Sequence, residues 1–335
     1  MKRKIVDWLS WQRMACYCFF AGLLSVPAVN FVVDPYEVFG TRLFPFSVSN
    51  ANMRYLKFEQ MRTQRFDALL AGSSVTQMID PRWIVDGDAN AFNLAAFSVD
   101  TLALELMLRE AVKHVKPGGN VIIGLDPALF IEAGDRGPAF KLHPDVSGES
   151  LLGWWKDYLF AASMKAIGYK IAGYFGPQNI ELSLEHGHYR LVSWDTEMRT
   201  DPLAYRAKKF TSKEVARSGE YVRDAGGVER IERIARALSE TDVVVTWVLM
   251  PVHPLMRAHI GEEQFSRLYA DILVALQSRS GRGDVIDLRE HPLTRDNGLW
   301  YEHRHFAPTA AKMVAAEIRG SISSSVVAAV RVGRK

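Results

Sequence analysis

Hydrophobic positions along the chain form short continuous runs that alternate with segments of helical periodicity. Five apolar runs are each long enough for one buried strand: 66–71, 91–95, 120–126, 242–250 and 284–288. Helices are predicted before, between and after them, over 50–65, 101–115, 228–239, 262–277 and 308–319. Apolar strands that alternate with helices predict an α/β fold, a three-layer α/β/α sandwich with a five-stranded parallel sheet.

The alternation stops between 131 and 225. This segment holds many glycines and prolines and a group of aromatic residues that includes Trp154, Trp155, Tyr189 and Trp194. We expect a large insertion over one end of the sheet, within a domain that spans 66–320. Its rings are expected to pack the insertion itself, and a lid whose rings stack on sugars is the alternative.

The N-terminal residues have the pattern of a membrane anchor. Segment 1–13 carries four basic residues and one acid, and segment 14–33 then runs without a charge. Twenty uncharged and mostly apolar residues match a bilayer core of ~30 Å. The positive-inside rule puts 1–13 in the cytoplasm and the body in the periplasm or otherwise outside the inner membrane. A cleaved signal peptide and a buried core helix of a cytoplasmic protein are the alternatives.

The segments on either side of the main domain are predicted from turn residues and polarity. Segment 34–65 begins with Pro35 and Gly40, which indicate a connector, and continues into the first helix. Segment 321–335 is small, polar or basic, and we expect a flexible tail there.

Composition narrows the class of protein. With 335 residues, 48% hydrophobic and 24% charged, the chain can bury a large core. The net charge is only +3 and the basic residues are scattered, so we expect no nucleic-acid binding. The only cysteines, Cys16 and Cys18, lie in the apolar segment, which excludes a disulfide framework or a cysteine nucleophile in the body.

The run 66–71 ends in Gly72-Ser73-Ser74, a sequence suited to a tight strand-to-helix turn. A hydroxyl there lies at the carboxyl end of a parallel strand, the edge where such sheets bind ligands. We therefore consider one of these serines a candidate nucleophile. A helix N-cap is the alternative, because serine is among the best capping residues.

A serine nucleophile needs a base and a group that orients the base. Both types occur near the end of the chain, where Glu302 and His305 precede a proline that opens the last predicted helix. His305 is the candidate base and Glu302 the group that holds its imidazole. His303 is the rival base, or a solvated loop residue.

Acyl transfer also needs hydrogen-bond donors for the developing oxyanion. The backbone N–H groups of Ser74 and Ala95 are candidates, and the Asn93 amide is a third unless it binds the turn backbone. His253 follows the fourth strand and is a candidate to line the site or bind a substrate oxygen, or a loop residue held by two prolines. The histidines lack a recognised metal-ligand spacing, and we expect no metal and no cofactor.

These motifs, in this order, resemble the SGNH/GDSL hydrolase superfamily, and most closely its membrane-anchored branch associated with cell-envelope polymers. They are Gly72-Ser73-Ser74, Asn93-Leu94-Ala95, Gly124-Leu125-Asp126 and Glu302-x-x-His305. The resemblance implies a flavodoxin-like sheet, with Ser74 as the nucleophile, His305 as the base and Glu302 as its orienter.

The chain also departs from the family pattern. Ser73 stands where the family usually has Asp, and Ala95 where it has Gly. Asp126 stands near the usual Asn donor of the oxyanion hole. An ionised Asp126 would repel an oxyanion, so it either points away or the site does something else.

The resemblance implies a membrane-anchored serine esterase or O-acyltransferase that acts on acyl esters, most simply acetyl esters, of a cell-envelope or exported polysaccharide. A membrane-bound O-acyltransferase is the partner that the resemblance implies. The alternative is a non-catalytic glycan-binding or assembly protein of a polysaccharide export or modification complex, which Asp126 would favour.

Overall fold

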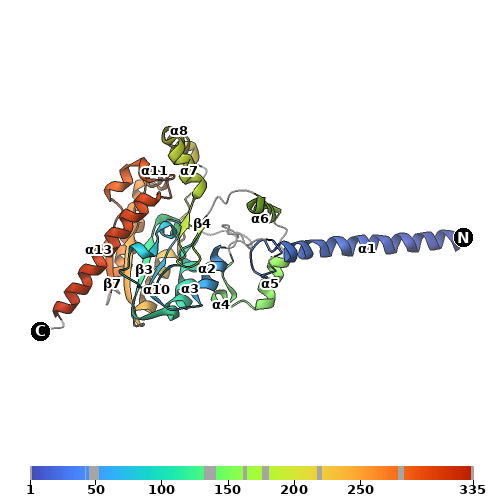
Figure 1. Ribbon diagram of the computed structural model, residues 1–335, viewed down its shortest axis with the longest axis horizontal. Helices are drawn as coiled ribbons and strands as arrows, with labels where there is room; N and C mark the ends of the chain where they lie inside the picture. The colour runs from blue at the N-terminus through green and yellow to red at the C-terminus, as the bar shows by residue number, and fades with distance from the viewer. Residues whose placement is uncertain are drawn as a thin grey trace.

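The computed structural model describes residues 2–41, 43–44, 53–131, 141–160, 164–175, 181–216, 221–277 and 283–332. Its centre is a five-stranded parallel sheet in the order β2-β1-β3-β6-β7 (Figure 1). The strands are β1 (Phe66–Ala71), β2 (Ala91–Asn93), β3 (Val115–Leu125), β6 (Val244–Leu249) and β7 (Gly283–Asp287). The expected α/β fold with five parallel strands is confirmed.

Helices cover both faces of this sheet because alternate strand residues point to opposite sides. Leu69, Val121 and Trp247 face one core, which is closed by α3 (Thr101–Ala111), α10 (Gly227–Ser239) and α12 (Glu262–Gln277). Leu70, Ile122 and Val248 face a second core, which is closed by α13 (Pro308–Val332). Each large side chain buried in these cores stabilises the fold by about 1.5–3 kcal/mol.

Two element boundaries differ most from the sequence-based expectation, and the others lie within four residues of it. β3 begins at Val115 and not at 120, because its first residue already pairs with Phe66 before the register shifts at Ala68. α13 continues to Val332, so residues 321–332 extend the last helix instead of leaving it at 319. Gly320 is the only glycine near that boundary, and the alanines and serines after it permit a helix.

The insertion contains two groups of elements. The first, α4 (Pro144–Ser147), α5 (Leu151–Phe160) and α6 (Met164–Phe175), includes helices that contact α1 (Lys2–Val33). The second comprises β4 (Glu181–Leu182), β5 (Tyr189–Arg190), α7 (Val192–Thr200), α8 (Pro202–Lys209) and α9 (Ser212–Ala216). Figure 1 shows α5 and α6 at the base of α1, and α7 and α8 near α11 (Pro254–Ile260).

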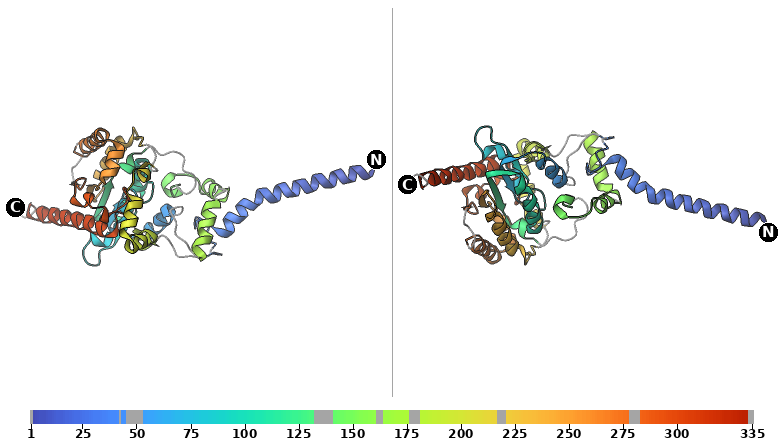
Figure 2. Two further views of the ribbon diagram at one scale, coloured as in Figure 1. Left: turned by 90° about the horizontal axis from the view of Figure 1, so that it is seen from above. Right: turned by 90° about the horizontal axis from the view of Figure 1, so that it is seen from below.

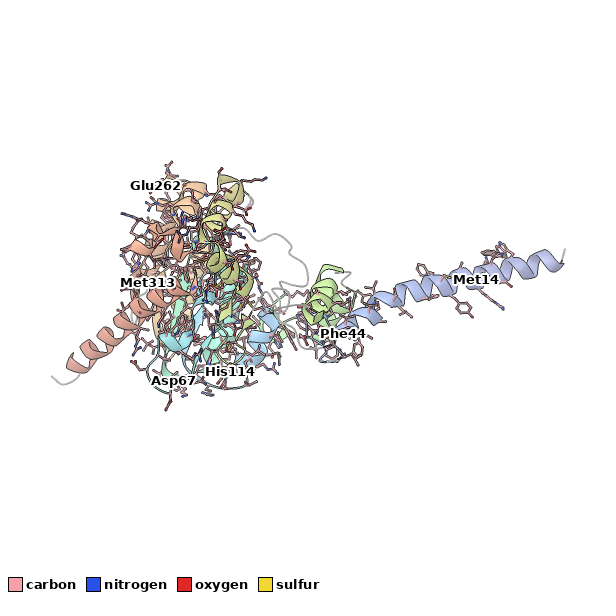
Figure 3. All side chains as sticks on the ribbon, turned by 45° about the horizontal axis from the view of Figure 1, so that its top comes forward. Met14, Phe44, Asp67, His114, Glu262 and Met313 are labelled. Atoms are coloured by element: carbon pink, nitrogen blue, oxygen red, sulfur yellow. The ribbon has the colours of Figure 1, made fainter. Side chains whose placement is uncertain are left out.

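α1 projects away from the rest of the chain (Figures 1 and 2). Its segment Ser10–Val33 has the length and apolar composition of a membrane span, and most of it is exposed. Figure 3 shows Met14 on this helix, far from Asp67, His114 and Glu262 in the sheet domain. The expected N-terminal apolar helix is therefore present, with residues 14–33 in its second part.

Candidate active site

The turn after β1 requires a glycine. Gly72 has a φ of +150°, and a Cβ at this position would lie 2.7 Å from the carbonyl oxygen of Gly124 on β3. This close approach of two backbones fits glycine alone. The next two residues, Ser73 and Ser74, therefore leave the sheet at the carboxyl end of its central strands.

Ser74, His305 and Glu302 form a continuous hydrogen-bonded row. The Ser74 Oγ lies 2.8 Å from the His305 Nε2, and the His305 Nδ1 contacts the Glu302 Oε1. With the Nδ1 proton directed at the carboxylate, the Nε2 is free to accept the hydroxyl proton. The arrangement is that of a serine nucleophile, its base and an orienting acid.

The Glu302 carboxylate is built to stay ionised. It accepts the backbone N–H groups of Arg304 at 3.1 Å and His305 at 3.0 Å. Burial alone would raise its pKa, but the charge and hydrogen bond of His305, with Arg304 and His303 nearby, lower the pKa to about 2. Glu302 therefore remains an anion that fixes the orientation of the His305 imidazole.

The loop that carries these residues is closed upon itself. Trp300 and Phe306 form a β-bridge, and the Tyr301 N–H donates to the His305 carbonyl oxygen at 2.8 Å. The Tyr301 hydroxyl donates to Asp195 of α7 at 2.6 Å. These bonds set the position of His305 before any substrate binds.

Ser73 is directed to a different partner. Its hydroxyl donates to the Asp126 carboxylate, which also accepts the Ala128 N–H at 2.9 Å. Burial raises the Asp126 pKa to about 6, although these two bonds and the charge of His305 oppose the rise. Asp126 thus links the turn after β1 to the turn after β3.

Two of the three expected oxyanion donors have other partners in this structure. The Asn93 Nδ2 donates to the carbonyl oxygens of Thr76 at 2.9 Å and Ile79 at 2.7 Å, so this amide binds turn backbone. The Ala95 N–H donates to the Asn93 Oδ1 at 3.0 Å. In the described part of the chain, the Ser74 N–H makes no hydrogen bond. It is the candidate donor that the structure leaves open.

The two other candidate histidines, His253 and His303, differ from His305 in the groups that their rings contact. The His253 Nδ1 accepts the Leu255 N–H at 3.1 Å, and its Nε2 lies 2.8 Å from the Asn297 Oδ1, so both ring nitrogens are used. Burial lowers the His303 pKa to about 4, and its Nδ1 lies 3.2 Å from the Glu302 Oε2. Neither ring contacts Ser74 among the described hydrogen bonds, whereas the His305 ring does.

Sequence reasoning missed Lys57 on α2 (Met53–Met61). Its side chain is fully buried, its Nζ contacts the Ala95 carbonyl oxygen, and burial lowers its pKa well below the usual range. Arg54, one turn earlier, donates to the Phe97 carbonyl oxygen at 3.0 Å. The spacing of two basic residues on the buried face of an expected helix was the available signal. Together they hold the loop that follows β2.

A cavity of about 360 Å³ lies beside the His305 loop. Its walls come from the turn after β1, from the β4–β5 pair and from the loop itself. Aromatic and charged side chains line it, among them Trp83, Tyr189, Tyr301, Arg82, Asp80 and Arg190. A smaller, mainly apolar cavity is lined by Asp126, His253 and His303.

Within the described ranges, no three His, Cys, Asp or Glu side chains lie close enough together to hold a metal ion. No protein-family model matches the chain, and no curated protein is significantly similar to it in sequence.

Proposed function

We propose that this protein is a membrane-anchored serine esterase or O-acyltransferase of the SGNH type. The observation that carries the proposal is the row of Ser74, His305 and Glu302, whose members come together from the two ends of the domain. Three residues separated by up to 231 positions are hydrogen-bonded in the order that acyl transfer requires.

In the first half of the reaction, the Ser74 Oγ attacks the carbonyl carbon of an ester. His305 takes the hydroxyl proton at its Nε2, and Glu302 stabilises the imidazolium that forms. The tetrahedral intermediate collapses as the His305 proton passes to the leaving sugar oxygen, and the acyl group stays on Ser74. In the second half, His305 deprotonates water or a second sugar hydroxyl, which attacks the acyl carbonyl carbon. The bond from that carbon to the Ser74 Oγ then breaks, the Oγ takes the proton back from His305, and the free acid or the new sugar ester leaves.

The negative oxygen of the intermediate needs a donor. The Ser74 N–H is available. Asp126 lies close to it, because Asp126 accepts a hydrogen bond from the adjacent Ser73 and interacts electrostatically with His305. A neutral Asp126 does not oppose the oxyanion, whereas an ionised one does. Below about pH 6, Asp126 is mostly neutral, and its charge then does not oppose the oxyanion.

The substrate side of the proposal rests on the larger cavity, which Tyr301 and Phe306 of the His305 loop line although Ser74 itself does not. Aromatic faces next to charged and hydrogen-bonding groups suit a sugar ring, which presents apolar C–H faces and polar edges. The basic segment 1–13 and the apolar helix α1 support a single-pass inner-membrane protein whose body is periplasmic. The family resemblance implies the substrate, which is a cell-envelope or exported polysaccharide. It also implies the partner, a membrane-bound O-acyltransferase.

The test is covalent labelling of the full chain with a fluorophosphonate probe, together with turnover of an acetyl ester. We expect an adduct on the peptide that contains Ser74, and loss of labelling and turnover in S74A and H305A. S239A, which changes a serine at the exposed end of α10, is the matched control and should behave as wild type. Retained turnover in either site variant would overturn the assignment.

One set of observations favours the non-catalytic alternative. Ser74 is only 7% exposed, and the Asn93 amide and Ala95 N–H already have partners. A glycan-binding protein that keeps this fold is thus the second candidate. It predicts no adduct in folded wild-type protein, and glycan binding that survives S74A.

A further inference from the structure

The insertion helix α5 exposes an apolar face. Leu151 is 53% exposed, Leu152 78%, Trp155 41% and Phe160 52%, and we call these four side chains the collar face. The opposite side of the helix is buried through Trp154 and Tyr158. Leu152 and Trp155 lie three residues apart on one side of the helix, and Leu151 and Phe160 are its first and last residues. Such a face on a helix of the surface needs a partner.

α5 is fixed to the last turn of α1. The Asn30 Nδ2 donates to the carbonyl oxygens of Tyr158 at 3.2 Å and Leu159 at 2.8 Å. These acceptors belong to the C-terminal turn of α5, where helical carbonyls lack intrahelical partners. The attachment joins the end of the apolar helix directly to the helix that bears the collar face.

Aromatic rings continue the apolar surface from α1 to α5. Phe31 of α1 lies 5.7 Å from Phe39, and Phe39 lies 6.2 Å from Trp155, measured between ring centroids. Phe31 and the adjacent Val32 are themselves exposed. The collar face is therefore continuous with the apolar surface of α1 at the end nearest the body.

The chain between these helices is also held in place. Lys170 of α6 is buried, forms an ion pair with Glu37 and donates to the Asp34 carbonyl oxygen at 3.2 Å. Asp34 in turn accepts the Val38 and Gly40 N–H groups at 2.8 and 2.7 Å. The junction between α1 and the insertion thus has defined geometry.

Figures 1 and 2 show α5 lying across the base of α1, not along its axis. The 24 residues of Ser10–Val33 span about 36 Å at the helical rise, which covers a hydrocarbon core of about 30 Å. When α1 crosses a bilayer, α5 therefore lies at the depth of the interface. Tryptophan and charged residues such as Lys156 and Asp157 beside apolar ones are typical of helices at that depth.

We propose that the collar face of α5 inserts into the interface of the same bilayer that α1 spans, with lipid as its occupant. This inference rests on the membrane-spanning role proposed for α1 and not on the chemistry of Ser74. The continuity of the collar face with the apolar end of α1 favours lipid over a second protein. A helix and an interfacial patch together hold the domain in one orientation to the membrane, which a single helix does not.

The test measures where labels on the full chain lie. In a C16S/C18S background, single cysteines are introduced as L152C on the collar face, F20C on α1 and L203C on α8, where Leu203 is 80% exposed. Each variant is spin-labelled in vesicles of phosphatidylcholine and phosphatidylglycerol, and its collision rates with oxygen and with a water-soluble nickel chelate are compared. We expect the oxygen-to-nickel ratio of L152C to exceed that of L203C at least threefold, towards the ratio of F20C.

Three results would overturn the inference. If the oxygen-to-nickel ratio of L152C equals that of L203C while the ratio of F20C is that of a site in lipid, α5 stays in water. Shielding of L152C from both reagents shows a protein contact, such as a second copy. A water-like ratio at F20C removes the premise that α1 spans. None of the labelled positions lies in the Ser74 site, so ester turnover by the same samples is read independently.

Discussion

Two adjacent serines at the end of β1 have different partners, and this difference defines the chemistry at the residue scale. Ser74 bonds the imidazole of His305, whereas Ser73 bonds a buried carboxylate, Asp126. A one-residue shift along the turn would exchange these environments. The sequence pattern alone favoured Ser74 through its place in a motif, and the geometry adds the physical reason, which is the direction of each hydroxyl.

The charge of Glu302, and not only its hydrogen bond, is expected to matter. In E302Q, an amide N–H or carbonyl oxygen faces the His305 Nδ1, the negative charge is lost and the imidazolium is less stable. We expect ester turnover to fall by about 10³–10⁴-fold, as for removal of the charge in other triads. Turnover is measured with an acetyl ester, and thermal unfolding checks the fold. A loss below tenfold would show that Glu302 does not act through His305.

Asp126 is expected to make stability depend on pH. Its pKa rises from 3.8 to about 6 on folding, so the native state binds this proton more tightly than the unfolded state. The resulting stabilisation is complete below about pH 4 and is lost as pH rises through 6. A shift of about two units corresponds to at most about 3 kcal/mol.

D126N removes this titration, because asparagine keeps an acceptor for the Ala128 N–H and carries no charge. The wild-type free energy of unfolding should therefore fall relative to D126N between pH 4 and 7, as measured by urea denaturation in detergent. A difference between the two proteins that stays constant over this range would contradict the pKa of Asp126.

At the element scale, the turn between β1 and the short 3-10 helix Thr76–Met78 depends on contact between neighbouring strands. Gly72 lies against Gly124 of β3, so the position of Ser74 is set by packing between β1 and β3. The methyl group of an alanine at position 72 would have to displace backbone atoms. The alanine would also have to adopt a φ that L residues avoid.

G72A is therefore expected to destabilise the protein by about 2–4 kcal/mol and to reduce probe labelling of Ser74. G148A is the matched control, because Gly148 also has a positive φ, of +72°, but open space around its Cβ. It should cost about 1 kcal/mol and leave labelling unchanged. Equal effects of both substitutions on labelling would show that the approach to Gly124 is unimportant.

Elements were easier to predict than contacts between them. Apolar runs and helical periodicity identified the strands and most helices, because those signals are local. The early start of β3 was missed, since Val115 pairs with Phe66 across a register shift that only the assembled sheet reveals. For the same reason, the burial of Lys57 was missed and the choice between the two expected roles of Asn93 stayed open: both depend on which loop lies opposite.

At the scale of the whole molecule, the insertion has two roles by position. Its first helices pack at the exit of α1, and its later strands line the cavity beside the His305 loop. The sequence indicated one insertion because its composition changes only at its two ends. The division into a membrane-side part and a site-side part follows from contacts with α1 and with the turn after β1, which lie far away along the chain.

The orientation of the chain across the membrane is the last expectation to test, and it decides which substrates the site can meet. In a C16S/C18S background expressed in a two-membrane bacterium, L203C on α8 should react with a membrane-impermeant maleimide in intact spheroplasts. K4C should react only after lysis, because the basic segment before α1 remains in the cytoplasm. Both variants should stay in the membrane pellet at alkaline pH if α1 is uncleaved.

Labelling of K4C before lysis would reverse the topology and exclude an envelope polysaccharide as the substrate. Release of L203C into the soluble fraction would instead identify residues 1–33 as a cleaved signal peptide, leaving the Ser74 site on the same side of the membrane.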